Sequence, residues 1–142
     1  MKTGFFKQID DSATKGFISI ALYPSKNDNV LLEFRALAPN WKLMENLKSN
    51  KISEDVFVKE YKKQLNNLNA KSIFDQINFL SSGNEPILMT HGNKTSFCHR
   101  HILAKWFEEE LGVIVEEFKI GNVIRSDGYM KKITQKSLFE NE

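Results

Sequence analysis

Residues 85–115 read EPILMTHGNKTSFCHRHILAKWFEEELGVIV. The short apolar run over Glu85–Thr90 predicts a buried strand, and the spacing of apolar residues over 97–111 predicts an amphipathic helix. Gly112 is typical of a helix C-terminal cap. The β-branched run Val113–Val115 then predicts a second strand. A strand, a helix and a strand in this order indicate a parallel pair of strands joined by a helical crossover.

The predicted helix over 97–111 has one apolar face. Ile102, Trp106 and Leu111 are expected to point into the core, with Thr95 or Ser96 near the N-terminal cap. Trp106 is the largest of these side chains, so its burial tests the helix assignment.

The sequence on the N-terminal side repeats the alternation of strands and helices. Gly16–Tyr23 is apolar and stops at Pro24, which predicts a buried strand, while Gly4–Ile9 and Leu31–Arg35 predict weaker strands. Helices are expected over 41–47, over 53–67 with Ser53 as cap, and over 70–82 with Gly83 at the end.

These elements predict one α/β domain over residues 1–142. We expect a mainly parallel sheet with helices on both faces, a Rossmann-like three-layer sandwich. Its core should include the segments 17–22, 87–90 and 113–115. The segment after Gly121 carries no clear pattern.

Composition narrows the class of protein. The 142 residues are 41% hydrophobic, which is typical of a folded globular chain. The net charge of +2 is too small to imply that the overall electrostatic field attracts nucleic acid or a membrane. One cysteine cannot form an intramolecular disulfide. No apolar run reaches the length of a membrane span, and the first residues lack the apolar core of a secretion signal. We therefore expect a soluble cytoplasmic protein.

The three histidines and the cysteine all lie within His91–His101. In open α/β sheets, ligands bind beyond the carboxyl ends of the strands, where helix N-termini offer free amides. The partial positive charge at a helix N-terminus lowers the pKa of a thiol and favours the neutral form of imidazole. We expect Cys98 and His99 to act chemically. The expected ligand-binding residues are Arg100, Tyr23, Arg35 and His101, with Trp41 as a further candidate.

Alternatives stay open for the same residues. A free cysteine often packs as a small apolar side chain. His91, Cys98 and His101 could supply three zinc ligands, but a fourth is missing. We expect no metal and no cofactor. The aromatic set Phe17, Tyr61, Phe74, Trp106 and Phe107 could stack on bases, although their helix and strand positions favour core packing.

The run Cys98-His99-Arg100-His101 after an apolar strand, together with Leu37-Ala38-Pro39, resembles the domain of unknown function 488 family. The similarity spans roughly residues 5–115. Members end the strand before the motif with Leu-Cys-aromatic-Glu, where this chain has Thr90 in place of the cysteine and Gly92 in place of the glutamate.

Two functions follow as hypotheses. The first is an enzyme of nucleotide or nucleic-acid metabolism that holds an anionic or phosphate group at the start of the Cys98 helix, by the Arg100 guanidinium and free amides. The alternative is a binding or regulatory protein that keeps the pocket without turnover, which the Thr90 and Gly92 replacements favour. The expected partner is an anionic small molecule, a nucleotide or a nucleic acid, and no membrane.

Overall fold

The centre of the structure is a sheet whose strands run mostly parallel. The computed structural model describes residues 1–10, 14–27 and 29–136. Over these residues seven strands form one sheet in the order β3-β2-β4-β1-β5-β6-β7. The strands are β1 (Lys2–Phe5), β2 (Phe17–Ser19), β3 (Leu32–Glu33), β4 (Ile87–Thr90), β5 (Glu116–Glu117), β6 (Gly121–Ser126) and β7 (Tyr129–Lys136).

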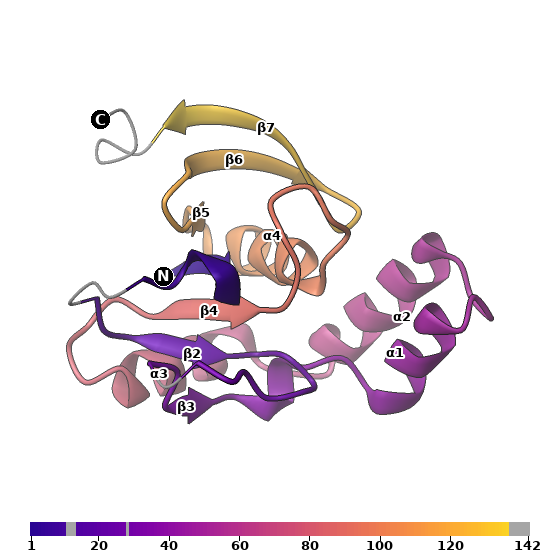
Figure 1. The fold of residues 1–142 in the computed structure, drawn as a ribbon, viewed down its shortest axis with the longest axis horizontal. Coiled ribbons are helices and arrows are strands. Elements are labelled where there is room, and N and C mark those ends of the chain that lie inside the picture. Colours follow the sequence, from indigo (N-terminus) through magenta and orange to yellow (C-terminus); the bar gives the residue numbers. More distant parts are fainter. Residues whose placement is uncertain (11–13, 28, 137–142) are drawn as a thin grey trace.

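The first five strands of that order pair in parallel, and β6 and β7 add an antiparallel hairpin at one edge (Figure 1). The helices are α1 (Trp41–Lys48), α2 (Glu54–Asn66), α3 (Ala70–Leu80) and α4 (His99–Leu111), with single 3₁₀ turns η1 (Phe6–Gln8) and η2 (Arg35–Leu37). The prediction of a mainly parallel α/β sheet with helices packed against it is confirmed.

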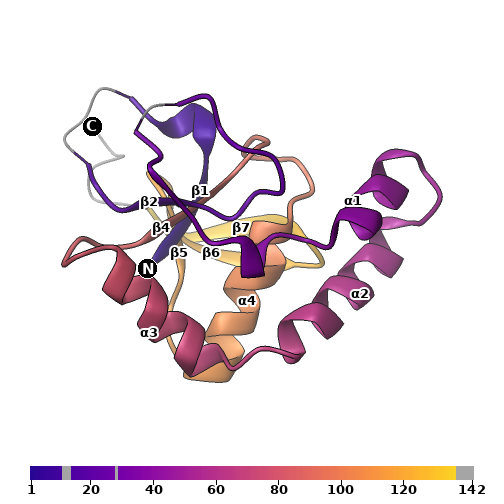
Figure 2. The same ribbon diagram turned by 90° about the horizontal axis from the view of Figure 1, so that it is seen from below.

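The two faces of the sheet are covered unequally. Figure 2 shows all four α-helices on one side of the strands and η1 on the other. On the helical side, Ile18 and Leu88 of the sheet pack with Phe107 of α4 in the main core. On the opposite side, the smaller cluster around Phe17 and Met89 is covered by residues of η1 and its neighbours. The expected second helical layer is therefore a single turn.

Helix caps explain where the helices begin and end. Ser53 caps α2 by accepting a hydrogen bond from the Val56 amide, as predicted. Gly112 ends α4 in the left-handed conformation at φ 65°, which glycine adopts without strain. By contrast α3 ends at Leu80 with Ser81 as its cap, before the predicted Gly83.

Three strand predictions need correction. The strand predicted over Gly4–Ile9 is β1, which ends at Phe5 where η1 begins. The strand predicted over Gly16–Tyr23 is β2 and shorter, and that over Leu31–Arg35 reduces to β3 because η2 begins at Arg35.

The last predicted strand was placed three residues too early in the sequence. Val113–Val115 lies outside the sheet, and β5 begins at Glu116. The Val115 amide donates to a Glu108 carboxylate oxygen of α4 at 3.0 Å, so this donor is committed outside the strand ladder.

The helix predicted over 97–111 is α4, which begins at His99 with Cys98 at the cap. Thr95 and Ser96 do not cap it, because their hydroxyls bond Asn93 within the preceding loop: Thr95 Oγ1 donates to the Asn93 side-chain oxygen, and Ser96 Oγ accepts from the Asn93 amide. Ile102 and Trp106 are buried as predicted. Leu111 is partly buried and packs against the core.

Candidate functional site

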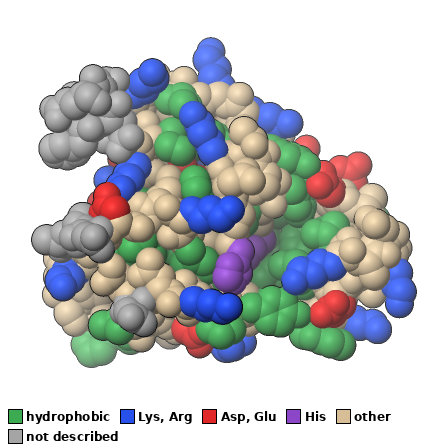
Figure 3. All heavy atoms as spheres, viewed as in Figure 1, with side chains coloured by type: hydrophobic (Ala, Val, Ile, Leu, Met, Phe, Trp, Pro, Cys, Tyr) green, Lys and Arg blue, Asp and Glu red, His purple; other side chains and the backbone are tan. Residues whose placement is uncertain are grey.

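A pocket of about 310 Å³ lies where β2 and β4 end and α4 begins. Its wall is mostly apolar and includes residues that follow the two strands, residues of α1 and α2, and the loop 91–98. Those that bear on the chemistry are Tyr23, Lys48, Thr90, His91, Cys98 and His99. Figure 3 shows the molecular face that carries the exposed histidine, and His91 is the exposed one of the three. The pocket therefore occupies the strand-end position where α/β folds bind ligands.

Cys98 borders the pocket from the cap position of α4. Its sulfur lies 3.1 Å from the Thr90 hydroxyl oxygen, 3.8 Å from the His91 carbonyl oxygen and 4.0 Å from His99 Nδ1. The side chain is 7% exposed. A thiol with three polar contacts beside a pocket is not simply packed as an apolar residue.

The tautomer of His99 follows from its other contact. Nε2 lies 2.8 Å from the Ile20 carbonyl oxygen, which can only accept a hydrogen bond, so Nε2 carries the proton. In the neutral ring, Nδ1 is then a free acceptor on the side of Cys98. Tyr61 packs edge-on against the His99 ring at 5.5 Å between centroids and donates its hydroxyl to the Leu37 carbonyl. The ring is held from both sides.

The surroundings of Cys98 favour the thiolate. Burial by itself raises the pKa of the thiol. The hydrogen bond to His99, the charges of His99 and Arg100, and the hydrogen bond to Thr90 together lower that pKa to about 6. At pH 7 a thiol with this pKa is roughly nine-tenths ionised, against a few per cent for an unperturbed cysteine.

Arg100 lies behind the pocket rather than in its wall. Its Nε donates to Glu117 of β5 at 3.0 Å, and its Nη2 forms an ion pair with the same carboxylate at 2.9 Å and donates to the Asn93 carbonyl at 2.9 Å. Nη1 donates to the Thr90 hydroxyl at 3.3 Å. The residue is completely buried. Sequence reasoning expected Arg100 to grip a ligand. In the structure its donors are committed to protein groups, and its charge reaches Cys98 through Thr90.

Glu117 is shared with a second buried arginine. Arg125 of β6 lies 3.8 Å from its carboxylate and donates to the Thr3 hydroxyl, which itself donates to Glu117 at 2.7 Å. Burial lowers the pKa of Arg125 despite the nearby carboxylates. For Arg100, the negative charges of Cys98 and Glu117 outweigh burial and raise the pKa. Both guanidinium groups depend on one carboxylate.

The other two expected ligand-binding residues lie apart from the pocket. His101 is buried on another side of α4, where both ring nitrogens lack a hydrogen-bond partner, and burial lowers its pKa to about 2. It lines a different cavity, of about 130 Å³. Arg35 is exposed, donates to the Leu22 carbonyl at 3.1 Å and pairs with Glu33. Of the residues expected to form the site, the pocket brings together Tyr23, Cys98 and His99.

The zinc alternative requires several metal-binding side chains to lie close together. Within residues 1–10, 14–27 and 29–136, no group of three or more His, Cys, Asp or Glu side chains is arranged to hold a metal ion.

Gly92, where the resemblance led us to expect a glutamate, lies close to the buried arginine. A Cβ atom on Gly92 would lie 3.8 Å from Arg100 Nη1 and 2.9 Å from the Ser96 hydroxyl. A glutamate there would therefore start beside the guanidinium that Glu117 binds instead. Gly92 also has φ +115°, a conformation that strains other residues.

Sequence reasoning missed Lys48, Glu117 and Arg125. Lys48 reaches the pocket from the end of α1, with Nζ 4.4 Å from the centre of the Tyr23 ring. The sequence pattern predicted only a short helix over 41–47, which ended before Lys48. Glu117 and Arg125 come from strands whose positions the sequence did not define, so no local signal marked them.

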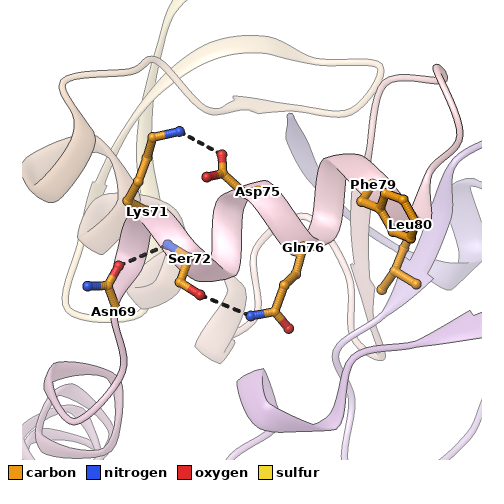
Figure 4. A pocket seen from close by; sticks show the side chains of 7 residues that line it. All are labelled: Asn69, Lys71, Ser72, Asp75, Gln76, Phe79 and Leu80. Atoms are coloured by element: carbon orange, nitrogen blue, oxygen red, sulfur yellow. Dashed lines mark hydrogen bonds and ion pairs between the residues drawn. The ribbon is translucent and has the colours of Figure 1, made fainter.

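A larger hollow of about 830 Å³ runs along the exposed side of α3 (Figure 4). Its polar side chains pair with one another: Lys71 with Asp75 at 2.6 Å, and Gln76 with Ser72 at 3.1 Å. It shares no residue with the Cys98 pocket. We do not assign it chemistry.

Across the part of the chain that the structure describes, none of the helices has the length and apolar character needed to traverse a bilayer.

The family model described as DUF488-N3a, the active DUF488-N3 subclade, matches residues 20–111. The matched range begins after β2 and covers β3, β4 and α1 to α4, and with them the pocket residues from Ala21 to His99. No curated protein and no solved structure matches the chain.

Proposed function

The chain belongs to the DUF488 family, and from its pocket we propose that it is an enzyme of nucleotide or nucleic-acid metabolism in which Cys98 reacts with the substrate. The observation that carries the proposal is the contact of Cys98 with His99, whose protonated Nε2 is fixed by the Ile20 carbonyl. A nucleophile, a base and a group that orients the base are the parts of an activated nucleophile. The description of the matching subclade as active supports this choice.

The protein groups that take part in the proposed chemistry are Cys98, His99, Thr90 and Arg100. His99 Nδ1 accepts the thiol proton, and the sulfur forms a bond to an electrophilic centre of the substrate. The bond from that centre to the leaving group breaks, and the proton on Nδ1 passes to the leaving group. Water or a second nucleophilic substrate then takes the bound group from the sulfur, and its proton returns to His99 and Cys98. The Arg100 charge and the Thr90 hydroxyl stabilise the thiolate before the bond forms. Sulfur and Nδ1 are 4.0 Å apart without substrate, and such contacts often shorten when substrate binds.

The pocket sets the size and kind of the reacting group. Its volume of about 310 Å³ is at the lower end for small-molecule sites. Its wall is largely apolar and aromatic, with Phe57 and Phe97 among the lining residues, so it suits a flat, uncharged ring such as a base. Lys48 and the α4 N-terminus lie at the wall, where an attached phosphate would be neutralised.

The test measures how fast Cys98 reacts with iodoacetamide at different pH values. Because the chain has one cysteine, mass spectrometry reports on this thiol alone. We expect a reaction midpoint near pH 6 in the folded protein and near the ordinary cysteine pKa of about 8.5 in the denatured chain. His99→Gln should move the folded midpoint upward. A nucleotide that occupies the pocket should slow the reaction.

The second candidate is a binding or regulatory protein that uses the pocket without turnover. The observation that favours it is Gly92, where family members carry a glutamate. A folded-state midpoint at or above 8.5, together with intact nucleotide binding, would establish this alternative and refute the enzyme.

A further inference from the structure

Two exposed aromatic rings stand at one side of the pocket mouth. Tyr23 lines the pocket and is 40% exposed, and Trp41 is 58% exposed at the start of α1. The Tyr23 hydroxyl donates to the Glu45 carboxylate of α1 at 3.0 Å, and Trp41 lies four residues before Glu45 on the same face of that helix. Lys48 lies over the Tyr23 ring. Neither ring is needed to fill the core, so both offer a face for stacking.

A basic hollow of about 170 Å³ lies beside the loop that forms the other side of the pocket. Its lining is Lys94, Lys119, Ile120, Ile133 and Lys136, with no acidic residue. Lys119 Nζ pairs with Asp10 at 2.7 Å, whereas Lys94 and Lys136 form no ion pair with any residue that the structure describes. Three lysines from distant parts of the chain thus converge, and the ion pairs within residues 1–10, 14–27 and 29–136 supply one counter-charge to them.

The same loop joins the hollow to the pocket. Lys94 belongs to the segment between β4 and α4, and five residues of that segment line the Cys98 pocket: His91, Gly92, Ser96, Phe97 and Cys98 itself. Figure 1 shows this segment passing from the end of β4 alongside β6 and β7. Figure 3 shows Lys and Arg side chains on the same face as the exposed histidine.

We propose that a single-stranded nucleic acid binds across the pocket mouth, with bases stacked on Tyr23 and Trp41 and phosphates on Lys94, Lys119 and Lys136. This inference rests on the proposed function and names its substrate class as a polymer rather than a free nucleotide. The hollow lies outside the pocket, where the phosphates of neighbouring nucleotides would continue. Single strands expose base faces to aromatic side chains, and paired duplex bases do not.

The experiment measures fluorescence anisotropy of labelled single-stranded DNA and RNA oligonucleotides of roughly 20 nucleotides. Trp41→Ala should weaken binding about tenfold, which equals about 1.4 kcal/mol. The double variant Lys94→Gln/Lys136→Gln should lessen the slope of log affinity against log salt by about 1.4, because each single-strand phosphate contact contributes about 0.7. The control is Lys51→Gln/Lys59→Gln, which removes the same charge from exposed positions elsewhere.

Intrinsic fluorescence gives a second measurement. The chain has two tryptophans, of which Trp106 is buried, so quenching on oligonucleotide addition reports on Trp41. Failure of both DNA and RNA to bind at low salt would overturn the proposal. Equal loss in the lysine variant and its control would do the same, as would tighter binding of duplex or of a mononucleotide than of single strands.

These failures are separable from failure of the proposed function. A Cys98 thiol with a low midpoint that only mononucleotides protect would refute the polymer substrate and keep the enzyme. Lysine-dependent binding of single strands with an unreactive thiol would refute the enzyme and keep the nucleic-acid site.

Discussion

Replacing Glu117 by Gln should unfold the protein at markedly lower denaturant concentration. The carboxylate is completely buried and accepts hydrogen bonds from Arg100 Nε at 3.0 Å and from the Thr3 hydroxyl at 2.7 Å. Arg100 Nη2 lies 2.9 Å from the same side chain and Arg125 Nη2 3.8 Å away. The glutamine keeps the shape of the side chain but removes the negative charge that pairs with both buried guanidinium groups.

The magnitude follows from the burial of the arginines. Breaking a buried ion pair by removing one partner costs about 3–5 kcal/mol, because a charge is left uncompensated in a low-dielectric interior. The Gln amide also turns one N–H group toward a guanidinium that only donates. Against a total stability of about 5–15 kcal/mol, this loss lowers Tm by about 10 °C or more for a chain of this size.

Urea unfolding followed by circular dichroism measures the loss, and the neighbouring residue supplies the control. Glu116→Gln makes the same chemical change at a side chain that is 38% exposed and lies 3.6 Å from Lys2 Nζ. Exposed pairs contribute about 0–1 kcal/mol, so this variant should stay close to the parent. If Glu117→Gln also stayed within about 0.5 kcal/mol of the parent, the buried network would not hold the sheet to α4 as argued.

Three further predictions concern packing, backbone and pH. Trp106→Ala should cost about 3–5 kcal/mol in unfolding free energy because the side chain is buried, and a loss under about 1 kcal/mol would contradict that burial. Gly128→Ala should cost about 1–3 kcal/mol more than Gly83→Ala, since both have positive φ but only at Gly128 would a Cβ collide with the Phe97 ring; equal losses by thermal unfolding would disprove the clash. The Cys98 thiol has a folded pKa of about 6 and an unfolded pKa of about 8.5, so it stabilises the fold at high pH and that contribution is lost as pH falls toward 6. The stability difference between the parent and Cys98→Ser should therefore grow by up to about 1.4 kcal/mol per pH unit between these values, and a flat difference in urea titrations would show an unperturbed thiol.

Much of the fold was predictable because its elements carry local signals. β4 is a short apolar run, α4 has an apolar stripe that ends at Gly112, and α2 begins at a serine cap. Each signal comes from residues close together in the sequence. The covering of the second sheet face was not predictable in this way, since it depends on where the chain after β1 turns into η1.

The position of β5 shows how tertiary contacts override propensity. Val113–Val115 is β-branched and predicts a strand, but the Val115 amide is committed to Glu108 and the Val115 carbonyl accepts from Arg125. The strand forms instead from Glu116–Glu117, residue types that are depleted in strands. The second of these is buried only because Arg100 and Arg125 arrive from α4 and β6. The residues next to Glu117 in the sequence carry no signal that predicts these two partners.

The placement of Cys98 and His99 beside a pocket was predictable, and the role of Arg100 was not. Strand ends and a helix N-terminus meet at one sheet edge, so the first residues of α4 had to lie there. Which side of the helix each residue faces depends on the 3.6-residue turn and on the available partners. Arg100 found a carboxylate 17 positions later in the chain. A sequence pattern shows a cation near the edge without showing whether its donors are free.

Successive residues of the motif at the start of α4 therefore point to different sides of the helix. Cys98 and His99 border the pocket, while Arg100 points behind it to Glu117. Since Thr90 contacts both the thiol and the guanidinium, the hydroxyl carries the influence of the buried charge to the sulfur. An arginine in this position can stabilise a thiolate and cannot also clamp a ligand. Recognition of a negatively charged ligand must then come from other cations, and Lys48, Lys94 and Lys136 pair with no carboxylate among the residues that the structure describes.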